Sequence, residues 1–136
     1  MGTPDKPIGV AIVICDRVIT DVRSNEKTLV ATFNRITARN FPCVHPRISI
    51  FVAVTGGKGP TNAQIRCMNE SANELVFESS GMINFANPNH VVEMNFELRN
   101  IAFPKPGLHG VEFLCEGELI LQRRFEVVQL QGGTKR

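Results

Sequence analysis

The stretch that decides the fold is residues 103–128, FPKPGLHGVEFLCEGELILQRRFEVV. It predicts a loop followed by two strands that are joined by a tight turn. Side chains of a strand alternate between its two faces, so the odd-numbered residues 109–115 would share the core face. Glu116-Gly117 supplies the turn because glycine accepts a positive φ, and Phe125 and Val127 then return apolar side chains to the core. This hairpin is typical of the last strand pair of an immunoglobulin-like domain.

The rest of the chain continues the pattern, because β-branched and polar residues alternate repeatedly and helix signals are scarce. Residues 10–15 form a continuous apolar run, which predicts a central strand. Residues 28–37 also fit a helical stripe, but their Thr and Val content favours a strand. About eight or nine strands at intervals of about 8–12 residues predict an all-β fold. We therefore expect a two-sheet antiparallel immunoglobulin-like β-sandwich.

Length and composition fit one ordinary domain. A chain of 136 residues with 43% hydrophobic residues buries roughly two thirds of its unfolded surface, enough for a core without metal or disulfide staples. We expect a single domain over residues 1–136, with an ordered core at about 8–130 and flexible termini. A formal charge of +2, without a basic stripe, argues against nucleic acid as a partner.

Nothing in the sequence predicts export or a membrane. The apolar run of residues 8–15 is too short to cross a bilayer, and Asp16-Arg17 follow it where a signal peptide needs a cleavage site. We therefore expect a cytoplasmic protein with reduced, mostly buried thiols. The four cysteines are Cys15, Cys43, Cys67 and Cys115.

The segment TGGKGPTN, residues 55–62, suggests a phosphate-binding loop but lacks its essential parts. Such a loop needs a glycine where Val52 stands, and Ser or Thr where Gly59 stands. Residues 63–69 alternate like a strand, so no helix N-terminus would follow to hold an anion. We expect the glycines to form a flexible connection between strands.

Signals for catalysis and for metal binding are weak. Cys43 and His45 are two residues apart, but a structural zinc site takes four ligands from paired motifs. A cysteine hydrolase needs an exposed thiol beside a histidine and an orienting group, and Cys43 is the only cysteine in an expected loop. We expect no cofactor, no metal and no enzymatic activity. The alternative is a small-molecule binder or enzyme with a site near Asp16, Cys43 and His45.

Two apolar loops contain the pairs Phe41-Pro42 and Phe103-Pro104. Each phenylalanine could plug one end of the sandwich. Alternatively, exposed Phe beside rigid Pro forms an interaction surface at a low cost in entropy. A sheet edge offers a second route to association. The leading prediction is thus a non-catalytic binding or assembly module with a protein partner or a second copy of itself.

Two long stretches, residues 14–59 and 98–127, resemble a family of uncharacterised bacterial proteins, a domain of unknown function. The shared features are Cys15-Asp16, Asn25-Glu26-Lys27, Phe33, Ile36, Phe41-Pro42, His45-Pro46, Phe103-Pro104, Pro106-Gly107, Gly117 and Phe125. The resemblance covers about residues 10–128 and implies a bacterial, cytoplasmic, single-domain protein with no established activity. At His109 the family usually has an aromatic residue, typically the tyrosine of a tyrosine corner. A histidine there can still bond to the backbone and serve the structure alone.

Overall fold

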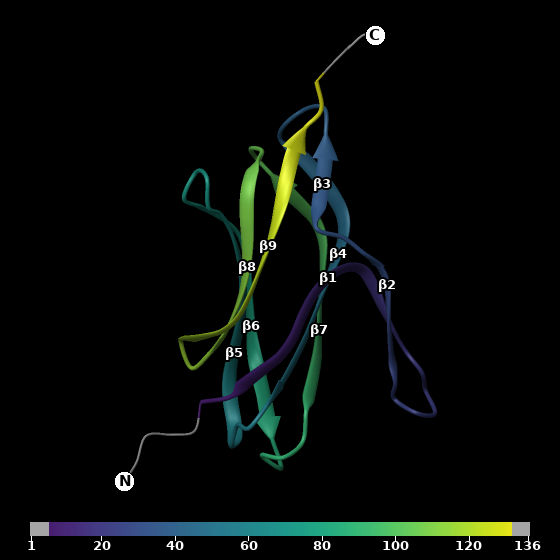
Figure 1. Ribbon diagram of the computed structural model, residues 1–136, viewed down its shortest axis with the longest axis vertical. Helices are drawn as coiled ribbons and strands as arrows, with labels where there is room; N and C mark the ends of the chain where they lie inside the picture. The colour runs from purple at the N-terminus through teal and green to yellow at the C-terminus, as the bar shows by residue number, and fades with distance from the viewer. Residues whose placement is uncertain (1–5, 132–136) are drawn as a thin grey trace.

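The computed structural model describes residues 6–131 and confirms an all-β fold (Figure 1). Residues 1–5 and 132–136, which include most of the ends expected to be flexible, lie outside the described residues. No helix occurs between residues 6 and 131, so no helix there could cross a membrane. The described residues form nine strands: β1 (Ile8–Thr20), β2 (Lys27–Thr32), β3 (Arg35–Ala38), β4 (Cys43–Thr55), β5 (Gly59–Asn69), β6 (Glu74–Phe85), β7 (Val92–Phe103), β8 (Gly107–Cys115) and β9 (Glu118–Gln129).

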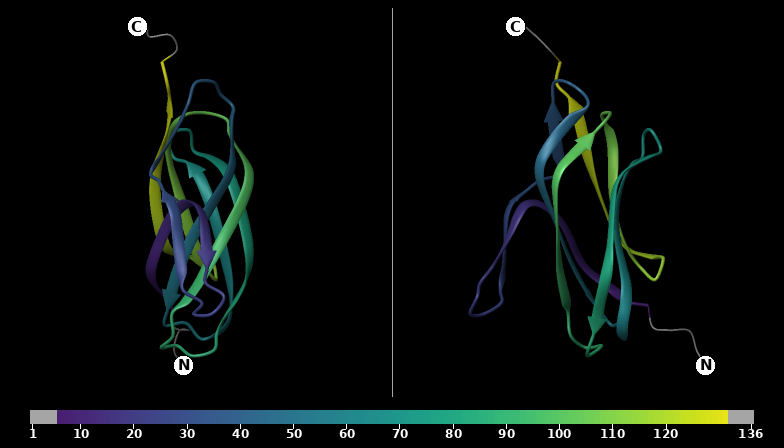
Figure 2. Two further views of the ribbon diagram at one scale, coloured as in Figure 1. Left: turned by 90° about the vertical axis from the view of Figure 1, so that its right-hand side faces the viewer. Right: turned by 180° about the vertical axis from the view of Figure 1, so that it is seen from behind.

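The strands form two sheets that enclose one core (Figures 1 and 2). The four-stranded sheet has the order β2-β1-β4-β7, and the five-stranded sheet has the order β3-β9-β8-β5-β6. The predicted hairpin of β8 and β9 is present, and Glu116 and Gly117 turn it with φ values of 50° and 80°. The two-sheet prediction is therefore confirmed.

One strand pair departs from the predicted antiparallel arrangement. Strand β3 runs parallel to β9, with Arg35 opposite Glu126. The expected single strand 28–37 divides here, because β2 pairs with β1 while β3 crosses to the other sheet. Backbone bonds hold the crossing on both sides: Phe33 N donates to Ile14 O at 3.0 Å, and Glu126 N donates to Asn34 O at 3.0 Å.

Several other strand boundaries differ from the prediction. Strand β1 extends beyond the expected run of residues 10–15 to Ile8–Thr20, and β4 begins at Cys43, which was expected in a loop. Strand β6 continues through Gly81, whose φ is not positive and which pairs with Ala63. Expected loop residues thus become the ends of long strands, which changes where the candidate residues point.

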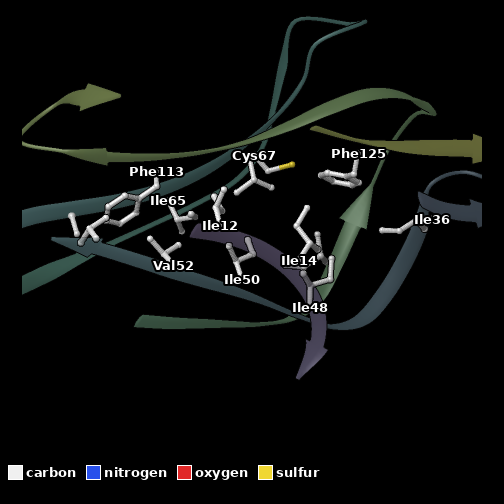
Figure 3. Close-up of a cluster of buried hydrophobic side chains, with 14 of the residues drawn as sticks. Ile12, Ile14, Ile36, Ile48, Ile50, Val52, Ile65, Cys67, Phe113 and Phe125 are labelled. Carbon is white, nitrogen blue, oxygen red and sulfur yellow. The ribbon is translucent and has the colours of Figure 1, made fainter. Parts of the chain in front are cut away.

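The core consists of apolar side chains from both sheets (Figure 3). Ile14 and Ile50 come from the four-stranded sheet, and Ile65 and Phe113 face them from the five-stranded sheet. Burying a side chain of this size stabilises the fold by about 1.5–3 kcal/mol relative to leaving it exposed. Along β8, all four predicted core-facing residues are buried: His109, Val111, Phe113 and Cys115.

Candidate functional site

The two sheets are unequal, and the extra strand leaves core-facing residues uncovered. On β6, Ser79 lies opposite Ile65 and Gly81 lies opposite Ala63, so all four share the core face. Ile65 and Ala63 are 0% and 2% exposed, whereas Ser79 and Gly81 are exposed. A Cβ placed on Gly81 would meet no other atom within 4 Å. The core face of β6 therefore extends beyond the cover that the four-stranded sheet provides.

Strand β7 is the edge of the four-stranded sheet on that side. Within residues 6–131 it pairs only with β4. In its first half, the core-facing side chains of Val92, Met94, Phe96 and Leu98 lie opposite fully buried residues of β4, yet they are only half-buried. The ring centroid of Phe96 lies 6.2 Å from that of Phe113 across the core. The five-stranded sheet therefore covers the core face of β7, whereas no strand within residues 6–131 covers its free side. We define the open edge as Ser79, Gly81, Val92, Met94, Phe96 and Leu98.

The outer face of β7 carries charge beside this open edge. Glu93, Asn95, Glu97 and Arg99 alternate with the core-facing residues. Arg99 Nη2 donates to Glu97 Oε2 at 2.9 Å. Within residues 6–131, Glu93 forms no ion pair, and it lines a cleft of about 570 Å³ together with Phe51 and residues 25–29 of the β1–β2 hairpin. Glu93 thus contributes a carboxylate next to the free side of β7.

Strand β6 is the neighbouring edge of the five-stranded sheet. Residues 79–85, SSGMINF, contain no charged residue and no proline. Natural edge strands are usually protected from pairing by lysine, proline, bulges or short length. This half of β6 has no protective side chain and is long, so it too can accept another strand.

The Phe-Pro pairs divide between the core and the surface. Phe103 is 0% exposed and lies at the end of β7, with its ring 5.4 Å from His109 and 6.1 Å from Phe125 between centroids. Phe41 is half-buried and packs against the core. The prediction of Phe103 as part of an exposed surface is therefore wrong, because the strand continues through it and turns its ring inward. Pro42 and Pro104 are exposed.

Sequence reasoning missed two exposed neighbours of these prolines. Val44 is 60% exposed and lies opposite Ala102, which is also exposed. The four residues Pro42, Val44, Ala102 and Pro104 make an uncharged strip, which we call the proline patch. Only the pairing of β4 with β7 brings these residues together, and that pairing could not be read from their positions in the chain.

The structure places Asp16, Cys43 and His45 in one region of β1 and β4, but their chemistry does not favour catalysis. Asp16 Oδ2 accepts a hydrogen bond from Arg47 Nη2 at 2.9 Å. Burial lowers the pKa of His45 and raises the pKa of the Cys43 thiol, so the thiolate nucleophile is disfavoured. The clefts of about 540 and 570 Å³ are lined by other residues. Among the described residues, no three His, Cys, Asp or Glu side chains gather to hold a metal ion.

His109 is a structural residue, as the sequence predicts. Its Nδ1 lies 2.9 Å from the carbonyl oxygen of Gly107, so Nδ1 carries the proton and donates it. Its Nε2 is buried and has no hydrogen-bond partner among the described residues. Burial lowers the pKa of His109, while the Gly107 carbonyl and Glu70 act in the opposite direction. The bond to the backbone two residues upstream fixes the orientation of the imidazole.

The glycine-rich segment connects β4 to β5, and thus one sheet to the other. Gly56 and Gly59 have φ values of 82° and 64°, which favour glycine. Gly57 is required for packing, because a Cβ there would lie 2.4 Å from the ring of Phe85. The segment is followed by strand β5 and not by a helix, as predicted.

Together these features define a class of protein: a two-sheet all-β domain with one open edge. The chain belongs to the DUF6941 family, described as a family of unknown function, which matches residues 10–128. A comparison with curated proteins found no match. The fold is similar to part of the Pseudomonas fluorescens alkylpurine DNA glycosylase AlkC, solved bound to DNA containing an abasic site analog. The similarity has a TM-score of 0.50 and 14% sequence identity, and covers 69% of this chain and 27% of that chain.

Proposed function

We propose that this protein is a non-catalytic binding or assembly module, and that it takes up an extended segment at the open edge. The observation that carries the proposal is the exposure of Ser79 and Gly81 on a core face, beside the half-buried row of β7. A strand added to β7 would pair with its backbone and cover these residues. Main-chain bonds would supply affinity, and side chains of alternate residues would supply specificity.

The energetics of such an addition are favourable. Each backbone hydrogen bond contributes about 0.5–1.5 kcal/mol net, and each Å² of buried apolar surface about 25 cal/mol. The side chains of Met94 and Phe96 are only half-buried, so an added strand could bury their remaining apolar surface. Gly81 leaves room for a large incoming side chain. An added strand of ordinary length therefore has several favourable contacts to offset the entropy that it loses.

The proposal includes three further properties. Association with a second copy is part of it, through the uncharged half of β6 or through the proline patch. A cytoplasmic location is supported by four free cysteines, three of them buried. An immunoglobulin-like classification is supported by the two-sheet core and by the closing β8–β9 hairpin.

The absence of enzymatic activity is likewise part of the proposal. It is supported by the engagement of Asp16 with Arg47 and by the raised pKa of the Cys43 thiol. These are the residues that the alternative of a small-molecule site would need.

The experiment compares two substitutions on the same strand. Gly81→Phe fills the space over the core face of β6, whereas Ser80→Phe places the same ring on the opposite face. Each variant serves as bait in extracts of the host cell, and sedimentation velocity over a wide concentration range reports self-association. We expect partner retention to be lost in Gly81→Phe and kept in Ser80→Phe. A wild-type chain that stays monomeric and retains no partner would overturn the proposal.

A further inference from the structure

We infer that the occupant of the open edge is an extended segment of a partner protein, apolar at alternate positions and basic at the position opposite Glu93. This inference rests on the proposed function and deepens it by naming the chemistry of the partner. Each part of the pattern follows from a separate feature of β6 and β7.

The apolar positions follow from the core face. An added strand pairs residue by residue with β7, so every second side chain of it would lie beside Met94, Phe96 and Leu98. Those side chains would also lie over Ser79 and Gly81, the smallest residues on the core face of β6. Because a Cβ at Gly81 meets nothing within 4 Å, the space there accepts a large apolar side chain.

The basic position follows from the outer face. The positions of an added strand that alternate with the apolar ones would lie beside Glu93, Asn95 and Glu97. Arg99 already neutralises Glu97 at 2.9 Å. Within the described residues, no cation lies within ion-pair distance of Glu93, although Lys27 lines the same cleft. A lysine or arginine opposite Glu93 would therefore form an ion pair with it across the strands.

A second copy of this chain is a poorer occupant of the same place. The core face of β6 reaches past β7 in each copy, as the exposure of Ser79 and Gly81 shows. If two copies paired through β7 about a twofold axis, both β6 strands would need the same space beneath the joined sheet. The free side of β7 therefore fits a single extended segment better than a strand that belongs to a two-sheet domain.

The test uses three synthetic peptides, each about seven residues long, as in an ordinary strand. One alternates valine with polar residues and carries lysine at its outer positions. The second has glutamate in place of lysine, and the third has the composition of the first in an order that breaks the alternation. Fluorescence anisotropy of labelled peptides measures their binding to the full chain. We expect the alternating basic peptide to bind most tightly and the reordered peptide to bind at least tenfold more weakly, or roughly 1.4 kcal/mol.

Two substitutions assign the binding to the inferred residues. Glu93→Lys should weaken binding of the basic peptide by about threefold and strengthen binding of the acidic peptide, since cross-strand charge pairs have effects of this size. Gly81→Phe should abolish binding, and Ser80→Phe should not. Gly81→Val serves as the milder variant if circular dichroism shows that Gly81→Phe does not fold.

The outcomes separate this inference from the proposed function. Equal binding of the basic and acidic peptides, unchanged by Glu93→Lys, overturns the assigned partner chemistry. It does not overturn the proposal that a strand is added at the open edge. Self-association that Gly81→Phe blocks, without peptide binding, shows that a second copy is the occupant and also overturns the inference. If the chain binds no peptide, retains no partner and does not self-associate, both the inference and the proposed function are overturned.

Discussion

The imidazole of His109 lies 5.3 Å from the ring of Phe125, centroid to centroid, with 35° between the ring planes. Phe103 completes the group and meets the imidazole edge-on, at 5.4 Å and 78°. This aromatic packing gives His109 a surrounding that favours its neutral form. The loss of water on burial is the main reason why its pKa is lowered, and the nearby Gly107 carbonyl and Glu70 only oppose it.

Stability should therefore fall as the pH falls through the range of histidine titration. An unfolded histidine titrates near about pH 6.5 and the folded His109 titrates lower, so between the two values the unfolded chain binds more protons. The free energy of unfolding should decrease as the pH drops below about 6.5. Urea unfolding at a series of pH values measures this effect. His109→Phe should flatten the pH dependence.

Two other histidines serve as controls for that experiment. The pKa of His45 is also lowered by burial, so His45→Gln should remove a separate part of the dependence. His90 is exposed and lies outside the aromatic group, so His90→Gln controls for the replacement of a histidine that lacks this packing. An unaltered pH profile in His109→Phe would contradict our account of the aromatic packing.

The cysteines should differ in their reaction with iodoacetamide. Burial raises the pKa of Cys67 to about 12 and, together with Glu116, the pKa of Cys115 to about 11. Only thiolates react, so at about pH 8 these two should be alkylated only after unfolding. Cys43 is half-buried and should react first, although more slowly than a free thiol, because its pKa is also raised. Mass spectrometry of peptides from native and unfolded protein gives the order. Rapid labelling of Cys43 would instead favour a reactive site there.

Core substitutions should cost far more than substitutions at the tip of the β1–β2 hairpin. Ile50 is 0% exposed at the centre of the core, and Ile50→Ala should lower the free energy of unfolding by about 2–5 kcal/mol. Val22 is 97% exposed, and Val22→Ala should change it by less than about 0.5 kcal/mol. Chemical unfolding of both variants provides the comparison, and similar losses would mean that the hairpin tip is packed in solution.

Two glycine-to-alanine substitutions should have opposite effects. At Gly57 a methyl group would clash with the Phe85 ring, and the resulting strain should cost about 1–3 kcal/mol. At Gly81 a methyl group meets no atom within 4 Å. Alanine there should stabilise the fold by roughly 0.4–1 kcal/mol, because it lowers the conformational entropy of the unfolded chain. The difference in thermal midpoint between the two variants tests both statements. If Gly81→Ala were as destabilising as Gly57→Ala, the core face of β6 would have to be covered.

The sequence allowed the all-β fold, the two sheets and the final hairpin to be predicted, because alternation and turn residues are local signals. The core positions from His109 to Cys115 followed from the same alternation. The passage of the chain from one sheet to the other at residues 33–34 could not be predicted, because both halves of 28–37 have the pattern of a strand and differ only in the strands with which they pair. Pairing choices depend on contacts between distant segments, which no local pattern records.

The candidate site was harder to predict for the same reason. Phe103 was placed in a loop because prolines follow it, although β4 pairs with β7 up to that residue. The open edge had no sequence signal beyond the uncharged run 79–85, since exposure of Gly81 depends on the number of strands in the opposite sheet. Sequence alone pointed to association and could not locate it.

The parallel β3–β9 pair also constrains how the chain can fold during synthesis. Arg35 and Glu126 meet although 91 residues separate them. Strand β3 must therefore wait until β9 has been synthesised and has left the ribosome before its partner exists. Such distant pairing makes folding slow, and it leaves early strands exposed to aggregation or to chaperones in the meantime.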